Sequence, residues 1–220
     1  MIEFRVNGRS FGTKQVLTSI EISLKQGRSL CIVGPSGCGK TTLLNALSGL
    51  EGDDKAVSWK GSAPEIGYLF QQPRLLPWRT LKQNLMLVEA DESKVLSMLD
   101  AVHLKEYVDY FPTRISLGMA RRASLARCLL LNPDLVLMDE PLVSLDSPTA
   151  QQMRQLIQKL ICEDPQKNLI YVTHDLEEAL EIGDQIIVLG NSPSEIVFSA
   201  DASDLSKEML ESELRNQLGL

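Results

Sequence analysis

The sequence predicts an α/β fold whose core is a parallel β-sheet with helices covering both faces. Five short apolar segments lead to this prediction, and helical patterns separate them along the 220-residue chain. Strands buried on both faces have continuous apolar sequences, whereas half-buried strands alternate apolar and polar residues. A chain of this length suits one large domain, or one domain with a small appended lobe. The five segments are residues 29–33, 66–70, 135–138, 169–173 and 185–189.

The N-terminal residues predict strands of a different kind. Residues 2–8 and 16–24 have strand patterns, and in the second segment Ile20, Ile22 and Leu24 alternate with polar residues. Such alternation is typical of a strand with one face in solvent. The turn-rich link between the two strands, residues 8–14, carries one exposed aromatic candidate, Phe11.

The remaining segments predict helices joined by loops. Residues 43–50 carry leucines at helical spacing, and residues 49–60 form a polar connection with one short strand at 56–59. Two prolines make residues 71–78 a loop with large side chains. Helical patterns cover residues 80–110, 119–131 and about 148–162, and a glycine-bearing turn at 115–118 precedes the second of them. A strand at 195–198 and an amphipathic helix at 204–220 end the chain.

The most informative segment is Gly34-Pro-Ser-Gly-Cys-Gly-Lys-Thr-Thr42, between the predicted strand 29–33 and the helix that follows. It fits the pattern G-x-x-x-x-G-K-[ST] of a phosphate-binding loop, or P-loop. Its glycines let successive backbone N–H groups face a phosphate chain, and the helix N-terminus adds partial positive charge. We expect Lys40 to reach the β- and γ-phosphates and Thr41 to offer its hydroxyl to Mg²⁺. The strand–loop–helix context disfavours the alternative, a glycine-rich turn that binds nothing.

Composition narrows the function classes. The net charge of −7 disfavours nucleic acid as a partner, because an acidic surface repels phosphate backbones. The four cysteines have no C-x-x-C spacing, which removes support for a zinc site and suits free thiols in a reducing cytosol. The N-terminus has no signal-peptide pattern, and no apolar run approaches the ~18 residues of a membrane helix. We therefore expect a soluble chain that reaches a membrane only through a partner.

Polar residues follow the predicted strands, and ligands of parallel sheets bind at the carboxyl ends of strands. Asp139 follows an apolar strand, where it can hold Mg²⁺, or less simply cap a helix. Glu140 can act as a base toward an attacking water, worth about 10²–10⁴-fold in rate, or stand in a surface salt bridge. His174 could contact the γ-phosphate or orient that water, although a lone histidine is usually structural. One site could collect Lys40, Gln71, Asp139, Glu140 and His174.

A second anion-binding candidate lies at the predicted turn 115–118. Ser116 and Gly118 would present a hydroxyl and free N–H groups at a helix N-terminus, or Ser116 could simply cap that helix. Two phosphate-binding elements in one chain raise the prospect that they meet across a dimer. Four nearby arginines predict a solvated helix face or pairs with acidic neighbours rather than nucleic-acid contact: Arg114, Arg121, Arg122 and Arg127.

Together these motifs resemble an ATP-binding cassette (ABC) ATPase over nearly the whole chain. Residues 34–42 are similar to its Walker A loop, Gln71 to its Q-loop glutamine and residues 115–119 to its signature. Residues 135–140 are similar to Walker B with its catalytic glutamate, residues 144–146 to the D-loop and His174 to the switch histidine. Phe11 stands where the family stacks an aromatic ring on adenine.

The resemblance implies the ABC ATPase fold, a P-loop NTPase parallel-sheet core with a small antiparallel β subdomain and a helical subdomain. It implies one domain over residues 1–220, with the helical subdomain inserted at about 72–130. The cofactors would be ATP and Mg²⁺, with Glu140, His174 and Gln71 catalytic and Thr41, Gln71 and Asp139 at the metal. Further nucleotide contacts would come from Phe11, Gly34, Pro35, Ser36, Gly37, Cys38, Gly39, Lys40, Thr41, Thr42, Ser116, Gly118 and Asp146.

The family's working unit is a head-to-tail pair, which implies a homodimer or a paired ABC subunit. Ser116 and Gly118 of one copy would cap the ATP of the other. The pair would drive a solute through a separate integral membrane permease from the cytoplasmic, inner face of the cell membrane, with a solute-binding protein in the complex. Exposed Leu75, Leu76 and Trp78 suit docking on a cytoplasmic helix of the permease. No nucleic acid is expected.

Residues 70–78 and 116–122 resemble the import ATPases for nitrate, sulfonate and taurine, which implies import of small anions or sulfonate-like solutes. Residues 118–122 also resemble lipid-trafficking ABC ATPases, which leaves that alternative open. An ABC ATPase acting on DNA or ribosomes would usually carry insertions or tandem cassettes, and a P-loop kinase would lack the signature turn. Two departures from the family stand out: Leu117 replaces a glycine and resists positive φ, and residues 49–65 are short.

Overall fold

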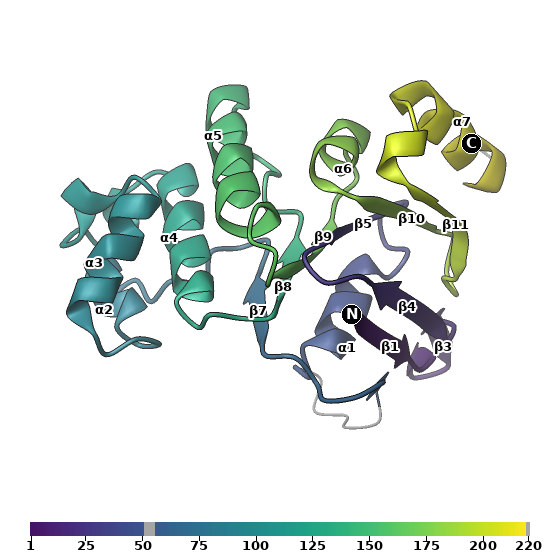
Figure 1. Ribbon diagram of the computed structural model, residues 1–220, viewed down its shortest axis with the longest axis horizontal. Helices are drawn as coiled ribbons and strands as arrows, with labels where there is room; N and C mark the ends of the chain where they lie inside the picture. The colour runs from purple at the N-terminus through teal and green to yellow at the C-terminus, as the bar shows by residue number, and fades with distance from the viewer. Residues whose placement is uncertain (51–55, 219–220) are drawn as a thin grey trace.

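The computed structural model of the chain describes residues 1–50 and 56–218. Its centre is a six-stranded sheet with the spatial order β11 (Ile196–Asp201), β10 (Gln185–Leu189), β5 (Ser29–Val33), β9 (Asn168–Val172), β8 (Leu135–Asp139) and β7 (Ile66–Leu69) (Figure 1). The strands from β10 to β7 run parallel, and β11 pairs antiparallel with β10. The predicted α/β class is confirmed, and the carboxyl ends of five strands share one edge.

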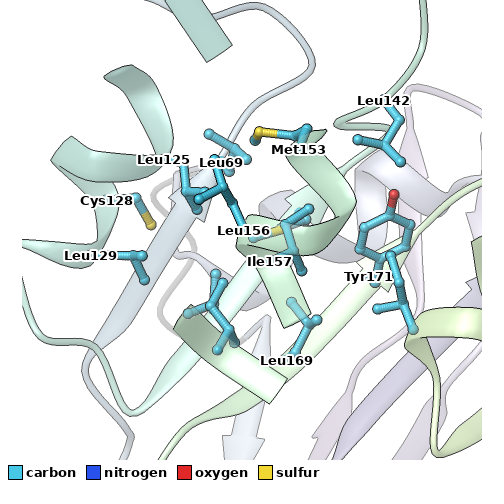
Figure 2. Packing of buried hydrophobic residues seen from close by; sticks show 14 of the residues in the cluster. Leu69, Leu125, Cys128, Leu129, Leu142, Met153, Leu156, Ile157, Leu169 and Tyr171 are labelled. Atoms are coloured by element: carbon cyan, nitrogen blue, oxygen red, sulfur yellow. The ribbon is translucent and has the colours of Figure 1, made fainter. Parts of the chain in front are cut away.

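The core strands send alternate side chains into two hydrophobic clusters, one on each face of the sheet. Leu30 and Ile32 join the cluster that includes α1 (Lys40–Leu47), whereas Cys31 and Val33 join the other. The second cluster is covered by α4 (Leu117–Leu129), α5 (Ser147–Ile157), α6 (Leu176–Ile182) and α7 (Lys207–Leu218). Burying one large aliphatic side chain contributes about 1.5–3 kcal/mol, so both layers stabilise the sheet. Figure 2 shows part of the second cluster, where Leu125, Cys128, Leu129, Met153, Leu156 and Ile157 meet Leu69 and Leu169 of the sheet.

A small antiparallel sheet lies on the α1 side of the core (Figure 1). Its strands are β1 (Ile2–Val6), β4 (Ile20–Leu24) and β6 (Val57–Trp59), in the order β4-β1-β6. Ile20, Ile22 and Leu24 are buried and alternate with exposed residues, as the sequence predicts. The link between β1 and β4 is itself a hairpin of β2 (Arg9–Phe11) and β3 (Lys14–Leu17).

A helical region lies between β7 and β8. The pattern at 80–110 forms α2 (Leu81–Leu85), α3 (Glu92–Ala101) and a 3₁₀ turn at Lys105–Tyr107. Residues 71–78 are irregular, as predicted, and Trp78 is 69% exposed. Leu75 and Leu76, however, are half-buried, and Leu75 packs against the core, so the expectation that these two leucines are exposed is wrong. The short connection expected at 49–65 includes residues 51–55, which lie outside the described residues.

The structure corrects the predicted turn at residues 115–118. α4 begins at Leu117, so Leu117 and Gly118 are helical, and Ser116 is the N-cap whose Oγ accepts the N–H of Met119 at 3.2 Å. Leu117 is not among the residues with positive φ, so it causes no strain of that kind. A Cβ at Gly118 would lie 2.2 Å from Cγ2 of Thr149 in α5. This glycine therefore lets α4 and α5 approach closely.

Candidate functional site

The P-loop joins β5 to α1 at the carboxyl edge of the sheet. Gly37 and Gly39 have φ angles of 78° and 112°, a region that residues with a side chain rarely adopt. Lys40 is only 6% exposed, and its Nζ donates to the carbonyl oxygens of Gly34 and Pro35 at 2.9 and 3.0 Å. The loop thus curves around one full positive charge beside a helix N-terminus, an arrangement that favours a bound anion.

Thr41 and Asp139 meet next to this loop. Thr41 Oγ1 donates to Asp139 Oδ2 at 2.9 Å, across from α1 to the last residue of β8. Asp139 is 6% exposed, and burial raises the pKa of its carboxyl, while the Thr41 hydrogen bond acts against that rise. A hydroxyl and a carboxylate are hard oxygen ligands of the kind that Mg²⁺ takes, and a cation would favour the ionised carboxylate. The residues present therefore fit this metal.

Glu140 leaves the strand that Asp139 ends. Asp139 still pairs with Val172 of β9, whereas Glu140 has a φ of 45° and donates its N–H to the Val172 carbonyl at 2.9 Å. A left-handed φ is strained for a residue with a side chain, and such strain clusters at functional sites. The change of direction places Glu140 Oε1 3.4 Å from Nδ1 of His174, which follows β9 and is half exposed. The two carboxylates thus have different neighbours.

The β2–β3 hairpin and a buried thiol frame the P-loop. A Cβ at Gly39 would lie 2.7 Å from Leu17 Cδ2, which shows how closely β3 approaches the loop. Phe11 in β2 is 56% exposed, so its ring is free to contact a ligand. Cys38 is 2% exposed and burial raises the pKa of its thiol. Its side chain therefore belongs to the core, and the loop can use only its backbone.

Other predicted site residues lie apart within one copy of the chain. Gln71 is exposed just after β7, the strand beside β8, and within the described residues no hydrogen bond joins it to Thr41 or Asp139. Ser116 is exposed at the start of α4, which packs on the sheet face opposite α1. Asp146 is exposed at the N-cap of α5, with no capping bond from its side chain.

Comparison with known proteins decides the family. The profile of the ABC transporter family matches residues 17–143, more than half of the chain. The chain belongs to the ABC transporter family.

Curated relatives and a solved structure agree with this assignment. The chain is 35% identical over 206 residues to aliphatic sulfonates import ATP-binding protein SsuB 2 of Burkholderia lata, covering 89% of this chain and 75% of the relative. It is 37% identical over 210 residues to SsuB 1 of Xanthomonas axonopodis pv. citri, covering 89% and 83%. A structure described as a dimeric post-hydrolysis state of the ATP-binding cassette MJ0796 bound to ADP and Pi matches with a TM-score of 0.75 at 27% identity, covering 92% of this chain and 99% of that chain.

As an ABC ATPase, the chain binds ATP with Mg²⁺, hydrolyses ATP, pairs with an ABC subunit and works with a membrane permease. The predicted family, fold, activity and cofactors are confirmed, and the relatives support the sulfonate side of the resemblance. Among the described residues, no helix combines the length and apolar character that crossing a membrane requires.

The arginine cluster of this ABC ATPase differs from the prediction. Arg121 is 5% exposed and donates to the Pro141 carbonyl at 2.7 Å, next to Glu140. Arg122 donates to the Val102 carbonyl and Arg127 to the Arg74 carbonyl. Within residues 1–50 and 56–218, these three arginines therefore neither form a solvated face nor pair with an acidic side chain. Arg114 is exposed, as predicted. Small residues on α4 leave room for the long side chains, but the sequence does not reveal which carbonyls receive them.

Two further residues were missed. Asn84 is fully buried and its amide bonds the backbone of Leu76, Arg79 and Thr80, which fixes the loop before α2. Glu178 of α6 accepts the hydroxyls of Tyr171 and Thr173 beside His174. The sequence carries no signal for this role, because His174 lies before α6 and regular helical spacing does not relate it to Glu178.

Proposed function

We propose that this ABC ATPase drives the import of small anions such as sulfonates through its membrane permease. The grouping of Lys40, the Thr41–Asp139 pair and the Glu140–His174 pair at one sheet edge carries the proposal. The curated relatives, named as aliphatic sulfonate import ATP-binding proteins, support the solute class and the direction. The active unit is a single domain over residues 1–220, with residues at about 72–130 as its helical subdomain.

Each group at the edge has a task in this proposal. The P-loop backbone and Lys40 bind the phosphates, and the exposed ring of Phe11 stacks on adenine, a contact worth about 1–3 kcal/mol for a base. Thr41, Gln71 and Asp139 hold Mg²⁺, which neutralises phosphate charge when bound. Glu140 takes the proton of the attacking water, and His174, 3.4 Å from Glu140, orients the reacting groups.

A second copy completes the site. Ser116 is exposed and lies on a helix that covers the other face of the sheet from α1, so its own P-loop is not its partner. The Ser116 hydroxyl and the first N–H groups of α4, including that of Gly118, bind the γ-phosphate held by the other subunit. Asp146 lies in the loop that borders this interface. ATP then favours the closed pair more than ADP does, which is the differential affinity that a switch requires.

The permease docks beside the loop at residues 71–78. A groove of about 300 Å³ runs between the edge of the sheet and α4, and its lining includes Tyr68, Phe70, Pro73, Val88, Arg127 and Leu131. The guanidinium of Arg74 lies 3.6 Å from the centre of the Phe70 ring, and this cation–π contact restrains the Phe70 side chain that lines the groove. An amphipathic cytoplasmic helix of the permease suits this partly apolar groove. The chain therefore works at the inner face of the membrane, and a solute-binding protein delivers the cargo on the other side.

The two-site mechanism can be tested with purified protein. Glu140→Gln keeps the shape of the side chain and removes the base, so ATP binds but is not hydrolysed. We expect Glu140→Gln with MgATP to elute as a stable dimer in size-exclusion chromatography. The control is Glu106→Gln, which removes an exposed carboxylate in the helical region; this variant should hydrolyse ATP and elute as a monomer. A monomeric Glu140→Gln protein that binds ATP would contradict the closed pair.

The solute class is tested in cells. Deleting the coding sequence from its host should abolish growth on ethanesulfonate as sole sulfur source and leave growth on sulfate unchanged. Equal growth on both would refute the sulfonate assignment without touching the ATPase assignment. If the deletion instead changed the lipid composition of the cell envelope, that result would favour the lipid-trafficking alternative.

A further inference from the structure

A carboxylate behind His174 holds the segment that carries it. Glu178 Oε2 accepts the Tyr171 Oη hydroxyl at 2.9 Å and the Thr173 Oγ1 hydroxyl at 2.8 Å. Tyr171 is fully buried in β9 and Thr173 is 2% exposed, so both donors are fixed by the core. Glu178 thereby ties the first turn of α6 to the end of β9.

The same hydrogen bonds continue on the far side of His174. Thr173 Oγ1 accepts the backbone N–H of Asp175 at 2.9 Å. Asp175 in turn caps α6, where Oδ1 accepts the N–H groups of Glu177 and Glu178 at 2.8 and 3.2 Å. The residues before and after His174 are therefore both held, whereas the imidazole itself is 56% exposed and has Glu140 as its contact.

We infer that Glu178 is a positioning residue for ATP hydrolysis: its carboxylate fixes residues 173–175 so that the His174 imidazole faces Glu140. The inference rests on the proposed role of His174. The backbone sets the direction of the Cα–Cβ bond of His174, so the positions of residues 173–175 determine whether a rotamer of the imidazole can reach Glu140. A misplacement of about 1 Å at a reacting centre can cost 10²-fold in rate, which makes such backbone support effective.

The test is a double-mutant cycle on the intact chain, with kcat and KM for MgATP as readouts. We expect Glu178→Ala to lower kcat about tenfold and to keep KM within about twofold, because the support acts in the transition state. The double variant with His174→Ala should be no slower than His174→Ala alone, because Glu178 acts through that imidazole. Glu177→Ala is the matched control, since this exposed neighbouring carboxylate pairs with Lys207 instead.

Three results would overturn the inference. Losses that multiply in the double variant would mean that Glu178 acts without His174. Glu178→Gln keeps an oxygen that can accept both hydroxyl hydrogen bonds, so its kcat should lie within about threefold of the wild-type value. A Glu178→Gln variant as slow as Glu178→Ala would contradict support through these hydrogen bonds. Full activity of His174→Ala would remove the role on which the inference rests, and the trapping test with Glu140→Gln would still judge the ATPase mechanism separately.

A second variant guards against misfolding of Glu178→Ala. Thr173→Val has nearly the same shape and removes both hydrogen bonds of Oγ1. We expect a similar fall in kcat with unchanged KM, and again no further loss in the His174→Ala background. A Thr173→Val protein with wild-type kcat would show that the hydrogen bonds around residue 174 do not position it.

Discussion

The substitution Gly118→Ala tests whether the close packing of α4 on α5 requires a glycine at this position. A Cβ at position 118 would lie 2.2 Å from Thr149 Cγ2, whereas the next nearest atoms, Thr149 Cβ and Leu145 Cδ2, are 3.6 and 3.9 Å away. Overpacking a core costs about 1–3 kcal/mol, and the higher helix propensity of alanine returns up to about 1 kcal/mol. We therefore expect the free energy of unfolding to fall by about 1–2 kcal/mol.

Urea denaturation followed by circular dichroism measures this loss. Thr149→Ser removes only the Cγ2 methyl, after which the nearest atom is 3.6 Å away, an ordinary contact. The double variant Gly118→Ala/Thr149→Ser should therefore recover most of the stability. If Gly118→Ala unfolds at the wild-type midpoint, or the double variant is as unstable as the single one, close helix packing is not the reason for the glycine. ATPase activity in a stable double variant then isolates any contact with nucleotide.

Three other perturbations follow from the structure. Asn84→Ala removes four hydrogen bonds from a fully buried amide, so it should cost about 2–4 kcal/mol and speed tryptic cleavage after Arg79, whereas exposed Gln72→Ala should change neither. Burial acts to raise the pKa of the Asp184 carboxyl, but hydrogen bonds from Ser29 and Arg28 hold this pKa below its usual value. The ionised carboxylate therefore stabilises the fold above about pH 4, and this stabilisation is lost as the pH falls further. Asp184→Asn should flatten the acid side of a plot of melting temperature against pH. Lys40→Ala should weaken ATP binding at least about tenfold in calorimetry, and unchanged affinity would contradict the P-loop assignment.

The sheet and the main site could be predicted because local sequence determines them. Continuous apolar runs are required wherever helices cover both faces of a strand, and this alone located β5, β8 and β9. Parallel strands end at one edge, so the position of Asp139 and His174 in the sequence sufficed to bring them together. The P-loop pattern is covalently local and gave the placement of Lys40.

The rest depends on contacts between distant segments. The burial of Arg121 requires a free carbonyl at Pro141, which only the packing of α4 against the following loop supplies. The role of Glu178 depends on the direction in which α6 leaves β9, and spacing does not reveal this direction. The start of α4 could be predicted only in part. Ser116 is a possible helix cap in the sequence, but Gly118 favours a turn there. The sequence does not show that Thr149 packs against Gly118, which is the structural reason for a glycine within the helix.

The bond from Arg121 to the Pro141 carbonyl has a mechanical consequence. A guanidinium stays protonated over the physiological pH range, so this hydrogen bond does not depend on pH there. Because this bond joins α4 to the residue after Glu140, a displacement of α4 would shift the backbone beside that carboxylate.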